Sequence, residues 1–175
     1  MSQHIAISAQ SQDEMAIHTI TKHIAESECF ILDAKLCKLG NDYGGLFFVA
    51  GNWRAMSVLE SRLKTLTNEK SMALFYKRTS EEMQDSSHLP YEVEVCALNH
   101  PKLLLNISQF FTTQKISIRD VNCSAYISHK TGAEMLSLEM LVDIPADTFI
   151  PDLRERYIEY CDELNLDATF DLQKL

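Results

Sequence analysis

The chain carries the same succession of hydrophobic patterns twice, in residues 4–78 and again in residues 91–172. Each half is predicted to run strand, helix, strand, hairpin turn, strand, helix, strand. Apolar residues alternate in the strand segments and recur every three or four positions in the helical ones. This βαββαβ order is the ferredoxin-like motif. We therefore predict an α+β fold with two tandem domains, each an antiparallel four-stranded sheet with two helices on one face.

The first domain is predicted over residues 1–78 and begins with a strand at His4–Ser8. Ser11 or Asp13 could cap the helix that follows, because a short polar side chain accepts a hydrogen bond from an unpaired amide. Asn52 is predicted to cap the second helix in the same way, and Met72–Tyr76 is the predicted fourth strand. The apolar stripes of the two helices are Ile17, Ile20 and Ile24, and Met56, Leu59, Leu63 and Leu66.

A polar segment, residues 79–90, is the predicted linker, and the second domain follows over residues 91–175. Val93 and Val95 alternate with glutamates, so one face of that strand is predicted to be buried and the other wet. The alternation changes phase near Arg119, which predicts a β-bulge. Asp147 is predicted to cap the last and longest helix. The stripe of the preceding helix is predicted to be Leu104, Ile107 and Phe111.

Composition disfavours several classes of partner. The formal net charge is −9 and the 16 Lys and Arg residues are scattered, so direct binding to nucleic acid is not expected. No apolar run approaches the length of a transmembrane helix, and no secretory signal is evident, so no membrane contact is expected. Five cysteines without a tight spacing pattern indicate reduced thiols and a cytoplasmic protein.

The sequence predicts no catalytic residues, no metal site and no cofactor. The six histidines include no pair four residues apart, and no Cys-x-x-Cys, Gly-x-Ser-x-Gly or phosphate-binding glycine loop occurs. An RNA-binding alternative rests on the aromatic run 43–49, but Asp42 stands where such motifs carry a basic residue. A small acylphosphatase-like hydrolase would need an arginine in the first loop, and residues 10–15 contain none.

The best candidate ligand positions are the two loops that join a strand to a helix, residues 10–15 and 98–102. A helix N-terminus presents unpaired amides and favours a carboxylate by ~0.3–1 kcal/mol. The alternative is that each loop simply caps its helix. The open face of each sheet must also be covered, either within the chain or in a homodimer.

Four segments together resemble a known family. The runs Ile17–Ile24, Leu36–Gly40, Ala50–Trp53 and Leu59–Ser61 are similar to the first domain of the glycine cleavage system transcriptional repressor family. Members of that family contain two ACT domains in tandem. The resemblance covers nearly the whole chain and rests mainly on architecture in the second half.

The resemblance implies a regulator without enzymatic activity, which acts by binding a LysR-type transcriptional activator and takes glycine as its signal. ACT domains generally bind amino acids at domain or subunit interfaces, in the loop after the first strand and the helix that follows. That loop often reads Asp-Arg-Pro-Gly. The matching residues here are Asp13, Glu14 and Met15 in the first copy, and Asn99, His100 and Lys102 in the second.

Neither loop keeps the family's glycine, which allows a ligand to approach the backbone. Glu14 would also repel a carboxylate, so the second loop is the better candidate. The alternative function is an amino-acid-binding ACT module that regulates a metabolic enzyme.

Overall fold

The computed structural model describes residues 2–68, 72–81 and 87–173. The chain divides into two compact units, Met1–Met83 and Gln84–Leu175, which we call domain 1 and domain 2. Domain 1 consists of β1 (Gln3–Ser11), α1 (Met15–Glu26), β2 (Phe30–Leu39), β3 (Asp42–Gly51), α2 (Trp53–Asn68) and β4 (Ala73–Thr79). Domain 2 consists of β5 (His88–Leu98), α3 (Leu103–Thr113), β6 (Ser117–Ile127), β7 (Glu134–Pro145), α4 (Ile150–Glu163) and β8 (Asp167–Leu172).

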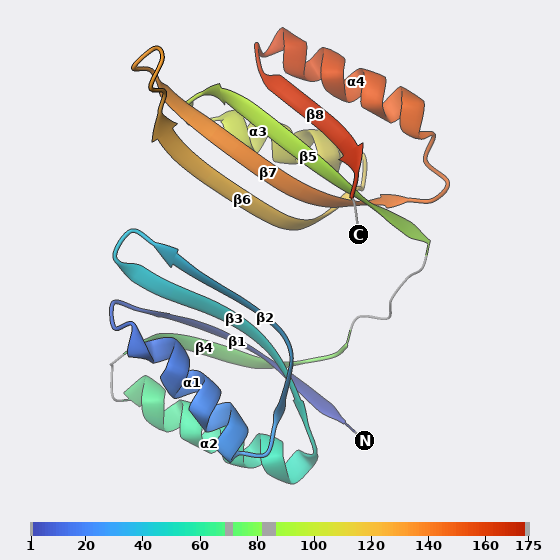
Figure 1. Cartoon of the computed structure of the whole chain (residues 1–175). Helices are drawn as coiled ribbons and strands as arrows, with labels where there is room; N and C mark the ends of the chain where they lie inside the picture. The colour runs from blue at the N-terminus through green and yellow to red at the C-terminus, as the bar shows by residue number, and fades with distance from the viewer. Residues whose placement is uncertain (1, 69–71, 82–86, 174–175) are drawn as a thin grey trace. The chain divides into compact units, whose positions relative to one another are not determined.

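Each domain contains one antiparallel sheet, with strand order β2-β3-β1-β4 in domain 1 and β6-β7-β5-β8 in domain 2. In each domain the two helices lie together on one face of the sheet (Figure 1). The predicted α+β class, with two tandem ferredoxin-like βαββαβ domains, is confirmed. No helix in the described parts of the chain is long and apolar enough to cross a membrane.

The core of domain 1 lies between the central strands and the two helices. Ile5 and Ile7 of β1 and Phe47 and Val49 of β3 point toward the helices and are at most 2% exposed. Alternation in the strands puts these side chains on one face, which the helices then cover. The predicted helix stripes fill the other side, with Ile17 only partly buried; their fully buried members are Ile20, Ile24, Met56, Leu59, Leu63 and Leu66.

The core of domain 2 follows the same plan and is rich in aromatic rings. Tyr157, Phe111 and Phe170 pack against one another with ring centroids 5.3–6.5 Å apart. The predicted α3 stripe is wrong at its first residue, because Leu103 is buried and Leu104 is 40% exposed. Leu103 lies four residues before Ile107 and therefore shares its face, whereas Leu104 is rotated away from it.

Turns and ends confirm some predictions and correct others. Asn52 caps α2, since its Oδ1 accepts a hydrogen bond from the Ala55 amide at 2.9 Å. The register of β6 shifts between Ile118 and Asp120, as the change in phase predicted. The capping role of Asp147 is wrong, because α4 begins at Ile150 with Phe149 as its N-cap, and α2 is the longer helix.

The predicted linker overlaps with strands at both ends. Thr79 ends β4, and His88–Pro90 begin β5, where Pro90 lies opposite Asp143. Residues 82–86 of that segment lie outside the described residues. Similarly, the fourth strand runs three residues beyond its predicted end at Tyr76.

The outer strand β2 differs from the central strands because all ten of its residues are exposed. It includes five large apolar side chains, Phe30, Ile31, Leu32, Leu36 and Leu39. A β-bulge lies between Ile31 and Asp33. The sequence thus predicts this strand correctly, although its apolar side chains are not buried in the domain.

We expect Ile107→Ala to destabilise the protein by about 2–4 kcal/mol, because the removed methyl groups leave a cavity in the fully buried core of domain 2. Leu105→Ala on the same helix is the control, since Leu105 is 58% exposed and its loss costs little. Urea unfolding followed by circular dichroism measures both. Equal losses in the two variants would contradict the assigned inner face of α3.

Candidate functional site

The loop between β1 and α1 is folded by its own side chains. The Asp13 amide donates to Ser11 Oγ at 3.1 Å, and Asp13 Oδ1 accepts from the Met15 amide at 2.9 Å. Asp13 thus satisfies the amide of the first residue of α1, but neither predicted residue is the N-cap, which is Glu14 with no side-chain capping hydrogen bond. Asp13, Glu14 and Met15 are all exposed. The predicted site segment is shorter than expected, because residues 10 and 11 belong to β1.

The loop between β5 and α3 is hydrogen-bonded to the first residue of β7, Glu134. The Asn99 amide donates to the Glu134 carbonyl at 2.9 Å, and Asn99 Nδ2 donates to Glu134 Oε1 at 3.3 Å. His100 Nδ1 accepts a hydrogen bond from the Lys102 amide at 3.2 Å. All three predicted site residues are exposed and lie just before the first turn of α3. The Asn99–Glu134 contact spans 35 residues, and no local signal in the sequence could have revealed it.

These contacts decide which groups remain for a ligand. Because His100 Nδ1 accepts a backbone hydrogen bond, we infer that the neutral ring carries its proton on Nε2, which is then a donor. Lys102 adds an exposed ammonium group, whereas Asn99 is already bonded to Glu134. The β5–α3 loop therefore offers two donors to an anion. The β1–α1 loop offers two carboxylates, from Asp13 and Glu14, which repel one.

The structure brings each predicted set together within its own domain. Asp13, Glu14 and Met15 lie at the start of α1, and Asn99, His100 and Lys102 lie at the equivalent place before α3. The two loops occupy corresponding positions in the repeated motif, after the first strand of each copy (Figure 1). Each is therefore a separate candidate site.

The histidine, cysteine and acidic side chains in the described part of the chain do not gather into a metal centre. No group of three or more His, Cys, Asp or Glu side chains could hold a metal ion there. All five cysteines are free; Cys29 and Cys161 are buried, and burial raises the pKa of both thiols. The buried Tyr157 hydroxyl lacks a hydrogen-bond partner, and burial raises its pKa far above the ordinary value. These groups contribute packing rather than reactivity.

A shallow hollow in domain 1 was not predicted from the sequence. It has a volume of about 810 Å³ and lies where β1 begins, α2 begins and β4 ends. Trp53, the only tryptophan of the chain, lines it and is 65% exposed. Arg78 also lines it, but its guanidinium is held by Glu60 at 2.5 and 2.9 Å and by Gln3. The packing of α2 beside β1 and β4 brings these residues together, so the sequence offered only the single tryptophan as a signal.

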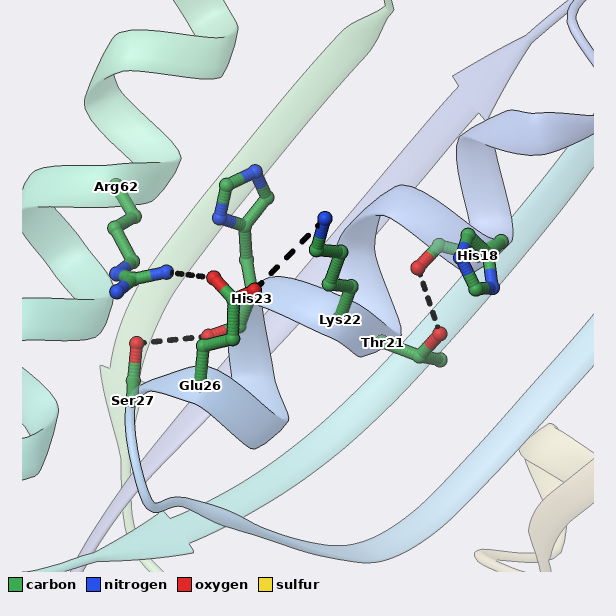
Figure 2. A network of polar contacts seen from close by, with 7 residues as sticks. All are labelled: His18, Thr21, Lys22, His23, Glu26, Ser27 and Arg62. Atoms are coloured by element: carbon green, nitrogen blue, oxygen red, sulfur yellow. Dashed lines mark hydrogen bonds and ion pairs between the residues drawn. The ribbon is translucent and has the colours of Figure 1, made fainter.

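The end of α1 is joined to α2 by a charged contact between Glu26 and Arg62, and nearby hydroxyl groups bond within α1 and its C-cap (Figure 2). Glu26 accepts a hydrogen bond from Arg62 of α2 and lies 3.9 Å from Lys22 Nζ, and the hydrogen bond from Arg62 lowers the pKa of Glu26. Ser27 Oγ donates to the His23 carbonyl at 2.7 Å, and Thr21 Oγ1 donates to the His18 carbonyl at 2.9 Å. The contact of Glu26 with Arg62 therefore ties the two helices together, while the buried His23 Nδ1 has no hydrogen-bond partner among the described residues.

No protein-family model matches the chain. Its sequence is 24% identical over 173 residues to the glycine cleavage system transcriptional repressor of Escherichia coli (strain K12), and equally so to that of Shigella flexneri. These matches cover 98% of this chain and 91% of each relative. The resemblance found in the sequence is therefore confirmed over nearly the full length, and both relatives are named for a regulatory role rather than a catalytic one.

Two solved structures share the fold of both domains. One is the crystal structure of a protein provisionally named a glycine cleavage system transcriptional repressor, with a TM-score of 0.74 and 19% identity, covering 100% of this chain and 99% of that one. The other is an unknown protein from Galdieria sulphuraria, with a TM-score of 0.78 and 14% identity, covering 99% and 100%. The tandem arrangement of the two motifs thus recurs in solved proteins.

We expect the contribution of the Glu60–Arg78 pair to the free energy of unfolding to depend on pH. The hydrogen bond from Arg78 lowers the pKa of Glu60 below its ordinary value of 4.5. The stabilisation is therefore complete above pH 4.5 and is lost as the pH falls through the lowered pKa. Glu60→Gln should cost about 0.2–1 kcal/mol at pH 7, and the difference from the unaltered protein should shrink in acid. Glu155→Gln is the control, and urea unfolding across this pH range is the measurement. A difference in stability that stays constant down to pH 3 would contradict the stabilising role of the pair.

Proposed function

We propose that this protein is a cytoplasmic transcriptional regulator of the glycine cleavage repressor type, which acts by binding a LysR-type activator. The observation that carries the proposal is the similarity to two named repressors over 98% of the chain. The fold supports it, because both copies of the motif are complete. The net charge of −9 argues that the chain controls transcription through a protein rather than by binding DNA itself.

We further propose that the regulator senses an amino acid such as glycine at the β5–α3 loop. The first turn of α3, the Lys102 ammonium and the His100 Nε2 proton would receive the carboxylate of the ligand. This proposal is supported by the engagement of His100 Nδ1 with the backbone, which fixes the orientation of the ring. The β1–α1 loop is a weaker candidate, because Asp13 and Glu14 stand where the carboxylate would lie. A homodimer would cover part of the open sheet surface.

A panel of the twenty amino acids in a thermal-shift assay, followed by calorimetry, tests the sensing proposal. A ligand at 100 times its dissociation constant adds about 2.7 kcal/mol to stability. Lys102→Gln should weaken binding by about tenfold, or 1.4 kcal/mol, because it removes the charged donor. Lys115→Gln at the opposite end of α3 makes the same change in charge and should leave binding unchanged. Equal affinity of the two variants would move the site away from this loop.

Reconstitution with a LysR-type activator on its operator DNA tests the regulatory proposal. We expect the protein to shift the activator–DNA complex further in a native gel and to lower transcription from it, with glycine reversing both effects. The protein without activator should leave the DNA unshifted even at low salt, where charge-driven binding is strongest. Salt-sensitive DNA binding by this chain alone, or stable capture of a metabolic enzyme in place of the activator, would contradict the proposal.

A further inference from the structure

The open faces of the two sheets, turned away from the helices, have different chemistry. Residues directly opposite in the strand register share a face, so the register assigns each side chain to the core or to the open side. In domain 2, Val93 and Val95 point to the core, which places Glu92 and Glu94 on the open face. The acidic residues on this face are Glu92, Glu94, Asp120, Glu139, Asp143, Asp167 and Asp171.

Domain 1 shows that the fold does not require an acidic open face. The corresponding face of its sheet carries apolar side chains such as Phe48 and Leu46, and the charged residues Asp33, Lys35 and Lys77. Residues 1–83 contain nine Lys and Arg against ten Asp and Glu, whereas residues 84–175 contain seven against fifteen. The negative charge of the protein is thus concentrated in domain 2, and much of it lies on one face of the sheet.

The arrangement of the carboxylates on this face is unfavourable in the free protein. Glu94 lies directly opposite Glu139 of β7, and Glu92 lies directly opposite Asp171 of β8. Like charges facing each other across neighbouring strands destabilise a sheet. Within the part of the chain that the structure describes, Glu92 and Glu94 make no hydrogen bond or ion pair.

Two arginines approach this face from its margins. Arg119, at the bulge, binds Asp143 at 2.5 and 2.9 Å, and Arg154 of α4 comes within 3.9 Å of Asp171. By contrast, the acidic residues of α4 itself are interleaved with Arg154 and Arg156. Glu139 accepts a hydrogen bond from Asn122 at 3.3 Å, and Asp171 has Arg154 nearby. Glu92 and Glu94 of the central strand β5 therefore keep a repulsion that a cationic surface would relieve.

We propose that the open face of the domain 2 sheet, centred on Glu92, Glu94 and Glu139, docks a lysine- and arginine-rich surface of a partner protein. The inference rests on the proposed function, since it names the chemistry by which the regulator recognises a protein. Complementary charge is the argument. On the neighbouring strands β5, β7 and β8, the exposed acidic residues of this face are Glu92, Glu94, Glu139, Asp167 and Asp171. Such a field raises the rate of encounter with a basic surface and repels nucleic acid.

Two identical copies of this face would not cover each other, because their carboxylates would repel. The apolar residues Leu98, Tyr126 and Met135 share the face at the end next to the β5–α3 loop. Leu98 is 65% exposed and Tyr126 is 43% exposed. They supply a patch for the apolar part of a basic partner, for example the stems of its lysine and arginine side chains. A partner bound there would lie beside the candidate amino-acid site.

The test compares two double variants of the full chain that change the charge equally. Glu92→Gln with Glu94→Gln neutralises the open face, and Glu155→Gln with Glu159→Gln neutralises two exposed glutamates on α4. The probe is a fluorescent synthetic peptide of alternating lysine and serine, followed by anisotropy at low and moderate salt. We expect the open-face variant to bind about tenfold more weakly than the unaltered protein, and the α4 variant to bind nearly as well as it. Binding should also weaken as salt screens the charges.

Three results would overturn the inference. Equal loss in the two double variants would mean that the peptide responds to net charge and not to this face. Absence of binding to the unaltered protein at low salt would mean that the face does not attract basic segments. A change in sedimentation of the open-face variant alone, without a change in peptide affinity, would assign the face to a second copy of the chain.

The same variants separate this inference from the proposed function. If the open-face variant forms the activator–DNA complex as well as the α4 variant does, the face is not the docking surface, and the regulatory proposal stands. If neither the unaltered protein nor the variants form that complex while the peptide result holds, the regulatory proposal fails and the face binds another basic protein.

Discussion

The fold depends on one constraint, which is that the central strands of each sheet must bury one face beneath two helices. In domain 1 the constraint falls on Ile5, Ile7, Phe47 and Val49, which are almost completely buried. Once these side chains are fixed, the register of β1 and β3 and the inner faces of α1 and α2 follow. A shift of one residue in either strand would move its whole apolar set into water. The same constraint acts on β5 and β7 in domain 2.

This constraint explains which parts of the fold could be predicted from the sequence. Buried strands and helix stripes leave a periodic pattern, so both βαββαβ units and the bulge near Arg119 could be recognised. The ends of elements are set by weaker local interactions, and there the predictions fail. The sequence favours Asp147 as a cap, yet α4 begins at Ile150, with Pro151 in its first turn. The sequence also favours Pro90 as the end of a linker, yet this residue lies within β5.

The candidate sites were only partly predictable, for a different reason. The positions of the two loops follow from the order of elements, and the structure places Asn99, His100 and Lys102 before α3 as expected. Their chemistry depends on contacts that form on folding, one of them across 35 residues. Glu134 engages Asn99, and the backbone of Lys102 engages His100, so the donors that remain could be assigned only after folding. The hollow beside Trp53 likewise combines three distant segments.

The open faces of the sheets are where the two copies were free to diverge. Packing against the helices restrains every second residue of a central strand and leaves the others to solvent or to partners. Glu92 and Glu94 could be placed on a wet face from their alternation with valine. That they meet Glu139 and Asp171 could not be predicted, because strand pairing joins residues 45 and 79 positions apart. Domain 1 has the same βαββαβ fold without facing carboxylates on its open face. The acidic face of domain 2 is therefore better explained by recognition of a partner than by a requirement of folding.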